Sequence, residues 1–463
     1  MRPATLFEIA AATAGEIIQG EPGITFNQIS IDSRKTRPGE LFLALQGERY
    51  DAHDFLAQAV MAGAGGVVAS RAVDVPEDIP LVKVRDTVAA LQALALWNRE
   101  RCGVRLIGVT GSTGKTTTKD IIASVLSTRL HTIKTAGNLN NEIGLPLTLL
   151  AIDAHHEAAV VEMGMRGPGE ITDLCRIARP NGAVITNIGE THLELLGSIS
   201  NIASAKGEIL DYVPPDGFAV INAASPFARR EAGRCCGKVV FFGLGQSCDI
   251  AVENIKAEDG GSYFTSVVAG KKNDYFMPVP GRHNVLNALA AIAVGLEFGL
   301  SSEDINRGLA AVTITGMRQE ITEAGNVKII NDAYNASPAS TGAALQLLKD
   351  LAGERRMVAV LGDMLELGPR AVSGHREVGE AVAEYGIDRL VAVGDLAKDI
   401  ADGALCAGLP AGKIYRCAGN TEAIAVLDSI LRGGDVVLVK GSRGMRMEQI
   451  VESLQSTLDQ APR

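Results

Sequence analysis

The chain has 463 residues and a formal net charge of −10, and 46% of its residues are hydrophobic and 21% charged. This length predicts about two to four domains of ~100–200 residues each, and the acidic balance argues against a general binder of nucleic-acid backbones. The N-terminus lacks the basic start of a signal peptide, and no uninterrupted apolar run reaches the ~18 residues of a membrane-spanning helix, so we expect a cytoplasmic protein without membrane insertion or a nucleic-acid partner.

The first segment, residues 1–102, mixes short strands and helices. A strand-like start and a polar turn lead to the apolar stretch at residues 41–45. The run FLAQAVMAGAGGVVAS then predicts a helix, a Gly-rich turn and a short strand. Because the segment contains no evident catalytic constellation, by itself it indicates a binding or packing module.

Two further segments alternate strands with helices. In residues 103–312, the runs LIGVT, AAVVEMG and AVITNIG are typical of buried strands, and KDIIASVLSTRL is helical. In residues 313–463, strands are expected at VKIINDA, MVAVLG, LVAVGD and DVVLVKG, with helices between most of them. This alternation predicts an α/β protein of three domains, with a mostly parallel central sheet and a Rossmann-like C-terminal unit.

A turn rich in Gly, Ser and Thr connects LIGVT to the helix that follows it. Its sequence predicts a loop that binds the phosphates of ATP, made of Gly111, Ser112, Thr113, Gly114, Lys115, Thr116 and Thr117. Glycines let backbone N–H groups approach phosphate oxygens, Lys115 neutralises the β- and γ-phosphates, and the Thr116 hydroxyl can bind Mg²⁺. The standard pattern has Gly where this chain has Val109. The alternative, an ordinary Gly-rich turn, explains GKTTT after a buried strand poorly.

Three more side chains could complete this site. Glu162 ends a predicted strand, where the ligand crevice of a parallel sheet lies, and its carboxylate suits Mg²⁺. His192 follows another strand and could bind a second metal ion or phosphate, or be merely a polar loop residue. Lys206 is expected at a helix start. Its ammonium group is a poor metal ligand unless CO₂ carbamylates it, and the alternative is a surface lysine.

A short polar loop with the sequence GNLNNEIG lies between the phosphate loop and Glu162. Its side chains could bind an uncharged or amide-bearing substrate, or serve only as turn and helix-cap groups; they are Asn138, Asn140, Asn141 and Glu142.

The motifs occur in an order that resembles the Mur ligase family over nearly the whole chain. They are TGSTGKTTT, GNLNNEIG, VEMGM, TNIGETHLELLGS, SAKGEIL and GRHNVLNALAA. The later run of GMRQE, NDAYNASP, VLGDMLELG and KGSRGMRME is most similar to the members that add D-alanyl-D-alanine. The Asp-Asn-Pro-Arg motif of the diaminopimelate-adding members is absent. NDAYNASP differs slightly from the commoner DSYNANP, which leaves roles around Asn331 and Ser337 open.

The resemblance implies a role for each domain and for individual residues. Residues 1–102 would bind the UDP-sugar end of a substrate through Ser33 and Arg34, and the central domain would bind ATP and two Mg²⁺ ions beside Asn138 and Asn141. The residues implied in catalysis are Lys115, Glu162, His192, Lys206 and Arg318. The implied metal ligands are Thr116, Glu162, His192 and carbamylated Lys206. Asn284 would approach adenine, Arg318 the γ-phosphate and Asp332 the ribose, with Tyr334 and Asn335 beside them in no firm role.

The run DVVLVKGSRGMRMEQI predicts a buried strand, a Gly-flanked turn and a helix. Backbone N–H groups of the turn and the Ser442 hydroxyl could bind the carboxylate of a dipeptide, with Lys440 or Arg443 as the countercharge. The alternative is a simple turn with an exposed arginine.

The activity that the resemblance implies is ATP-dependent amide ligation in peptidoglycan synthesis, with consequences for cell-wall biogenesis, cell shape and division. A monomer would join D-alanyl-D-alanine to UDP-N-acetylmuramoyl-tripeptide through an acyl phosphate. The third residue of the tripeptide, Lys or meso-diaminopimelate, stays open. The alternatives are another ligase of the superfamily, similar to folylpolyglutamate synthase, and a noncatalytic nucleotide-binding regulator.

Overall fold

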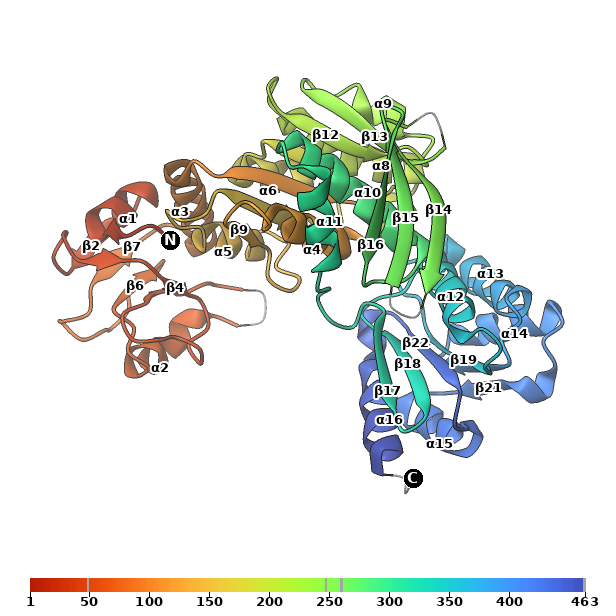
Figure 1. Cartoon of the computed structure of the whole chain (residues 1–463). Helices are drawn as coiled ribbons and strands as arrows, with labels where there is room; N and C mark the ends of the chain where they lie inside the picture. The colour runs from red at the N-terminus through yellow and green to blue at the C-terminus, as the bar shows by residue number, and fades with distance from the viewer. Residues whose placement is uncertain (48–49, 246–247, 259–260, 461–463) are drawn as a thin grey trace.

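The computed structural model describes residues 1–47, 50–245, 248–258 and 261–460. The chain passes through three consecutive parts, from the red and orange N-terminal part through the yellow and green centre to the blue C-terminal part (Figure 1). Strands of each part pair only with strands of the same part. The α/β class and the parallel central and C-terminal sheets predicted from the sequence are confirmed. In the described residues, no helix combines the length and apolar character needed to cross a membrane.

The N-terminal part has a five-stranded sheet in the order β2-β7-β6-β5-β4 and a small β1-β3 pair. Its elements are β1 (Ala4–Thr5), α1 (Leu6–Ala12), β2 (Glu16–Gln19), β3 (Thr25–Phe26), β4 (Ile29–Ser30), β5 (Leu41–Leu43), α2 (Leu56–Met61), β6 (Gly66–Ala69), β7 (Leu81–Lys83) and α3 (Thr87–Cys102). Strand β5 occupies the first three residues of the apolar stretch at residues 41–45. This part has a core of its own between the sheet and α2, and it shares a second core with the central part.

Helix α3 connects the N-terminal part to the central part. The Asn98 side chain donates hydrogen bonds to the carbonyls of Leu149 and Ile152 at 2.9 and 3.0 Å, and Arg99 donates to the carbonyl of Ala178. The apolar core beneath α3 is continuous with that of the central part. The boundary at residue 102 stays a prediction, because α3 packs against both parts.

The central sheet has the order β16-β15-β14-β13-β12-β11-β8-β10-β9 in the described ranges. Its strands are β8 (Arg105–Thr110), β9 (Thr132–Lys134), β10 (Ala158–Glu162), β11 (Gly182–Ile185), β12 (Phe218–Asn222), β13 (Lys238–Leu244), β14 (Ile250–Glu258), β15 (Gly261–Val268) and β16 (Lys271–Met277). Strands β9 to β14 are parallel, as predicted. The antiparallel extension β14–β15–β16 was not expected from the sequence; β15 and β16 are joined by a turn at Ala269 and Gly270, both with positive φ.

Helices cover both faces of the central sheet because neighbouring strand residues point to opposite sides. Leu106 of β8 packs in one core, and Ile107 and Val109 pack in the other. The helices of this part are α4 (Lys115–Leu126), α5 (Gly144–Leu150), α6 (Glu170–Ala178), α7 (Leu193–Leu196), α8 (Ile199–Gly207), α9 (Ala228–Ala232), α10 (Arg282–Glu297) and α11 (Ser302–Ala310). Because β8, β10 and β11 are parallel, their carboxyl ends meet at one edge of the sheet.

The C-terminal sheet has the order β17-β18-β22-β19-β20-β21, and only β17 is antiparallel to its neighbour. Its elements are β17 (Glu320–Ala324), β18 (Val327–Asp332), α12 (Pro338–Ala352), β19 (Met357–Gly362), α13 (Ala371–Glu384), β20 (Arg389–Val393), α14 (Ala397–Cys406), β21 (Ile414–Cys417), α15 (Asn420–Ile430), β22 (Val436–Lys440) and α16 (Glu448–Gln460). All four strands expected here are present. The Asp120 carboxylate on α4 accepts a hydrogen bond from the Thr315 N–H at 2.9 Å, which ties the connection between α11 and β17 to the central part.

Candidate active site

A cavity of about 1290 Å³ lies where the central and C-terminal parts meet. Its wall includes the phosphate loop, the polar loop after β9, the end of β10 and the residues after β18. The predicted site residues that line it are Ser112, Thr113, Gly114, Lys115, Thr116, Thr117, Asn138, Asn141, Glu162, His192, Asn284, Arg318 and Asp332. Residues far apart in the sequence thus surround one space.

The phosphate loop joins β8 to α4, and its residues 112–117 line the cavity. Gly111 and Gly114 have φ of 150° and 76°, which side-chain-bearing residues rarely adopt. Asn187, after β11, accepts a hydrogen bond from the Thr113 N–H at 2.9 Å and donates to the Thr113 hydroxyl at 2.5 Å. Lys115 Nζ donates to the Gly111 carbonyl at 2.8 Å. The loop is therefore held in shape before any ligand arrives.

Glu162 sits at the end of β10, as predicted, and both of its carboxylate oxygens are engaged. One accepts from the Thr116 hydroxyl at 2.7 Å and the other from the Asn140 side-chain amide at 2.8 Å. The side chain is buried, so the alternative of a water-exposed acid does not apply. A carboxylate and a hydroxyl in contact at a phosphate loop form a pair of oxygens suited to a hard cation.

Lys206 lies in the last turn of α8, so the prediction that it begins a helix is wrong. Ser198 caps the helix upstream by accepting a hydrogen bond from the Asn201 N–H at 3.1 Å, which starts the helix well before the lysine. The side chain is buried rather than on the surface. It does not line the cavity, but its neighbour Lys115 does.

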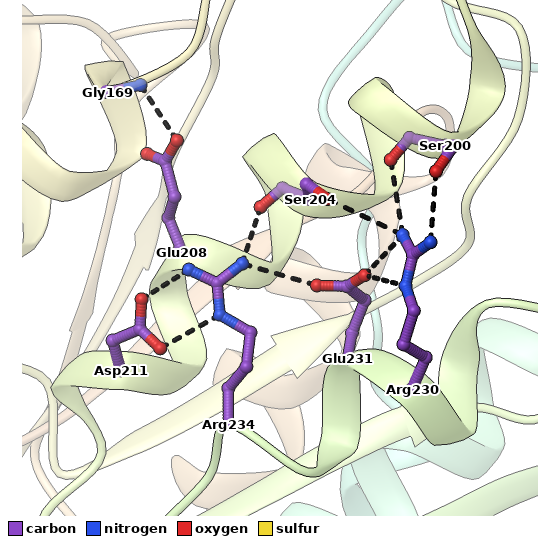
Figure 2. A network of polar contacts seen from close by, with 8 residues as sticks. All are labelled: Gly169, Ser200, Ser204, Glu208, Asp211, Arg230, Glu231 and Arg234. Carbon is purple, nitrogen blue, oxygen red and sulfur yellow. Dashed lines mark hydrogen bonds and ion pairs between the residues drawn. The ribbon is translucent and has the colours of Figure 1, made fainter.

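Two arginine side chains, one in α9 and one just after it, contact α8 along its length (Figure 2). Arg230 and Arg234 donate hydrogen bonds to backbone carbonyls of α8, and the buried Glu231 carboxylate accepts from both arginines. A Cβ atom on Gly207 would overlap the Glu231 carboxylate. The network therefore packs directly against the residue after Lys206, and Arg234, which donates to the Ser204 carbonyl, places its positive charge near the C-terminal turn that carries the lysine.

The charges around the phosphate loop influence one another. Burial lowers the pKa of Lys206 well below its usual range, and the nearby charge of Lys115 lowers it further. Burial also lowers the pKa of Lys115, against the opposing effect of Glu162. The pKa of His192 is lowered by burial more than the Glu366 carboxylate raises it, with smaller contributions from Lys206 and Lys115. Burial therefore disfavours the charged forms of Lys115, His192 and Lys206 relative to their forms in water.

The C-terminal wall brings another cation to the cavity. The Arg318 guanidinium stacks on the Tyr334 ring with its Cζ 3.8 Å from the centroid. Asn284 donates to the Gln319 side chain at 2.7 Å, and the buried Lys440 Nζ pairs with Asp332 at 2.5 Å. Tyr334, to which no firm role was given, therefore supports Arg318.

Four predicted substrate-binding residues lie outside the cavity wall. Ser33 donates to Gln58 at 2.9 Å, and the exposed Arg34 pairs with Asp32. The Ser442 hydroxyl accepts from the Leu365 N–H at 2.9 Å, and Arg443 pairs with Glu448 at 2.9 Å. Their binding roles stay predictions.

Several residues that shape the site were missed as site residues. Asn187 braces the phosphate loop, and Gln319 accepts hydrogen bonds from both His283 and Asn284. Glu366 contacts His192 from the C-terminal part. Asn187 carried a usable signal, since it follows a predicted strand next to the phosphate loop, whereas the motif VLGDMLELG that contains Glu366 gave no indication of a contact with His192.

The strand–loop–helix unit and the buried carboxylate beside it define a nucleotide-binding P-loop α/β protein. Models of three domains match the chain: the Mur ligase family catalytic domain at residues 25–98, the Mur ligase middle domain at 109–295 and the Mur ligase glutamate ligase domain at 317–443. The chain belongs to the Mur ligase family.

Characterised relatives cover almost the whole chain. A UDP-N-acetylmuramoyl-tripeptide–D-alanyl-D-alanine ligase of Bacillus subtilis (strain 168) is 43% identical over 429 residues, with 92% of each chain covered. The Escherichia coli (strain K12) ligase of the same name is 38% identical, with 97% of this chain and 99% of the relative covered.

Solved structures agree with these relatives. A crystal structure of MurF from Acinetobacter baumannii superposes with a TM-score of 0.90 at 34% identity, covering 98% of this chain and 99% of that one. MurF from Thermotoga maritima in complex with ADP gives a TM-score of 0.82 at 29% identity, covering 94% and 98%. Folylpolyglutamate synthase of Mycobacterium tuberculosis gives 0.64 at 22% identity, covering 81% and 94%, which shows a shared fold alone.

Proposed function

We propose that this protein is an ATP-dependent amide ligase that joins D-alanyl-D-alanine to UDP-N-acetylmuramoyl-tripeptide in peptidoglycan synthesis. The products are UDP-N-acetylmuramoyl-pentapeptide, ADP and phosphate. Relatives with this name cover nearly the whole chain, and one related structure contains ADP. The observation that carries the proposal is that Lys115 of the phosphate loop and Arg318 of the C-terminal part line one cavity together with Asn138 and Asn141.

The chemistry starts from a carboxylate that does not react directly with an amine at neutral pH. The tripeptide carboxylate attacks the γ-phosphorus of ATP and forms an acyl phosphate with ADP as the leaving group. The dipeptide amine then attacks the acyl carbon, and collapse of the tetrahedral intermediate releases phosphate. Lys115 of the phosphate loop and Arg318 of the C-terminal part, which both line the cavity, offset the charge on the transferred phosphoryl group and hold it in line.

The residues present suit Mg²⁺ held in part by the nucleotide. Within the described ranges, no group of three or more His, Cys, Asp and Glu side chains gathers to hold a metal ion by itself. Mg²⁺ usually keeps several waters and binds one or two carboxylates plus phosphate oxygens. Thr116 and Glu162 would hold one ion, and His192 with carbamylated Lys206 a second. Bound Mg²⁺ would neutralise phosphate charge.

Carbamylation of Lys206 fits its surroundings. CO₂ reacts with a neutral amine, and both burial and the charge of Lys115 lower the pKa of Lys206, so the neutral form is favoured. The carbamate carries a negative charge, which the neighbouring Lys115 stabilises. The oxygen atoms of the carbamate on Lys206 can then bind a metal ion, which the unmodified ammonium group cannot do.

The remaining assignments concern the substrates and the organisation of the chain. The proposed domains are residues 1–102, 103–312 and 313–463. Ser33 and Arg34 in the first bind the UDP-sugar end, which lies away from the reacting carboxylate in a long substrate. Ser442 and Arg443 in the last bind the dipeptide carboxylate. The enzyme acts as a cytoplasmic monomer and supports cell shape and division.

One assay tests the activity against its alternatives. The protein is incubated with ATP, D-alanyl-D-alanine and either the Lys or the meso-diaminopimelate UDP-tripeptide, and products are identified by mass spectrometry. We expect a pentapeptide product and no phosphate release when either substrate is omitted. Glutamate addition to a folate would instead indicate the folylpolyglutamate synthase-like activity, and ATP binding with no amide product would indicate a regulator.

A further inference from the structure

A carboxylate of the C-terminal part contacts a predicted metal ligand of the central part. Glu366 Oε2 lies 2.7 Å from His192 Nδ1, and Glu366 Oε1 accepts from Arg166 at 3.1 Å. His192 lines the cavity, whereas Glu366 does not. The glutamate therefore contacts a residue of the cavity wall without lining the cavity itself.

The contact selects one form of the imidazole ring. A carboxylate at Nδ1 accepts a hydrogen bond, so the proton of a neutral imidazole resides on Nδ1 and the lone pair on Nε2. Metal-binding histidines generally donate their other N–H to a carboxylate or carbonyl, which fixes the ring orientation and raises its basicity. Glu366 stands in that position relative to His192.

The backbone around Glu366 is built for close approach to the central part. Glu366 itself has φ of 62°, a strained value for a residue other than Gly. A Cβ atom on Gly368 would lie 2.9 Å from the Cβ of Glu194, and Arg370 pairs with Glu190. This loop after β19 therefore docks against the loop that carries His192.

We propose that Glu366 is a positioning residue that orients His192 for metal binding, and that docking of the C-terminal part thereby completes the metal site. The inference rests on the proposed function, which assigns His192 as a metal ligand. Because Glu366 and His192 are 174 residues apart in the chain, the orienting contact exists only when the two parts are together. Metal affinity and domain docking are coupled through this one hydrogen bond.

Binding of Mn²⁺ in the presence of ADP, measured by electron paramagnetic resonance, tests the inference without using activity. We expect Glu366→Ala to weaken binding at one site by about 10–100-fold, the usual effect of losing such a partner. Glu366→Gln retains an oxygen that accepts from Nδ1–H, so it should weaken binding less. Arg370→Ala is the matched control, since it removes a neighbouring contact between the same parts but leaves His192 untouched.

A double-mutant cycle separates orientation from general docking. In a His192→Ala background, Glu366→Ala should have no further effect on Mn²⁺ affinity, because it acts through the histidine. Equal losses for Glu366→Ala and Arg370→Ala, or an unchanged affinity for Glu366→Ala, would overturn the inference alone. Absence of ADP-dependent Mn²⁺ binding in the unsubstituted protein would overturn the inference and the metal part of the proposed function together.

Discussion

Substitution of Lys115 by Met separates the role of its charge in nucleotide binding from any role in folding. Lys115 Nζ donates one hydrogen bond, to the Gly111 carbonyl, and burial lowers its pKa. Its charge therefore has a desolvation cost in the unliganded protein that an apolar side chain of similar shape avoids. We expect Lys115→Met to fold and to be at least as stable as the unsubstituted protein without nucleotide.

The expected loss appears when nucleotide is added. At a concentration 100 times its Kd, a nucleotide stabilises the protein by ~2.7 kcal/mol. Hydrogen bonds to charged groups contribute about 1.5–3 kcal/mol, so losing Lys115 should reduce that stabilisation to about 0.3–1.3 kcal/mol. Phosphoryl transfer should slow by about 10²–10³-fold.

Denaturation with and without ADP and Mg²⁺ measures this loss directly. Lys398→Met is the control, because Lys398 is exposed and, within the described residues, its ion pair is with Asp395 at 2.8 Å. It should keep the full stabilisation by nucleotide. A folded Lys115→Met protein with the same nucleotide-dependent stabilisation and near-normal turnover would refute the reasoning.

Three other predictions address separate features of the site. Lys206→Ala should be inactive and should lose the carbamate signal that NMR detects after exposure to ¹³CO₂. Bicarbonate with a short carboxylic acid should partly restore its turnover. An unmodified Lys206 in active enzyme contradicts this prediction. His283 is half-buried in the cavity wall, and its partial removal from water lowers its pKa below the usual 6.5. Below pH 6.5 the unfolded chain therefore binds more protons than the folded one, so the contribution of neutral His283 to stability is complete above pH 6.5 and is lost as the pH falls through the folded pKa. We expect His283→Gln to flatten the pH dependence of the free energy of unfolding, measured by denaturation between pH 7.5 and pH 5. An equal slope in the two proteins argues against this role. Ser442→Ala and Arg443→Ala should each raise the KM for D-alanyl-D-alanine much more than that for ATP, and unchanged dipeptide kinetics would place the carboxylate elsewhere.

Local patterns in the sequence determined much of the fold and the centre of the site. The run LIGVT followed by GSTGKTTT specifies a buried strand, a glycine turn and a helix from short-range preferences alone. Glu162 was placed correctly because a strand's end is visible in its apolar run. The alternation of strands and helices likewise indicated parallel sheets, because two neighbouring parallel strands need a crossover connection, which is usually a helix.

The tertiary structure decided which distant residues meet. The contact of Asn140 with Glu162 and that of Arg318 with Tyr334 depend on how loops pack, which no local pattern encodes. The depth of Lys206 depends on the sheet and helices around it, and a lysine in a helix is usually exposed.

The contact of Glu366 with His192 depends furthest on the whole fold. It joins residues 174 positions apart, and it forms only when the C-terminal part lies against the centre. The sequence therefore determined the local elements and the phosphate loop through short-range geometry, whereas burial, charge coupling and the contacts between domains follow from long-range packing of the complete chain.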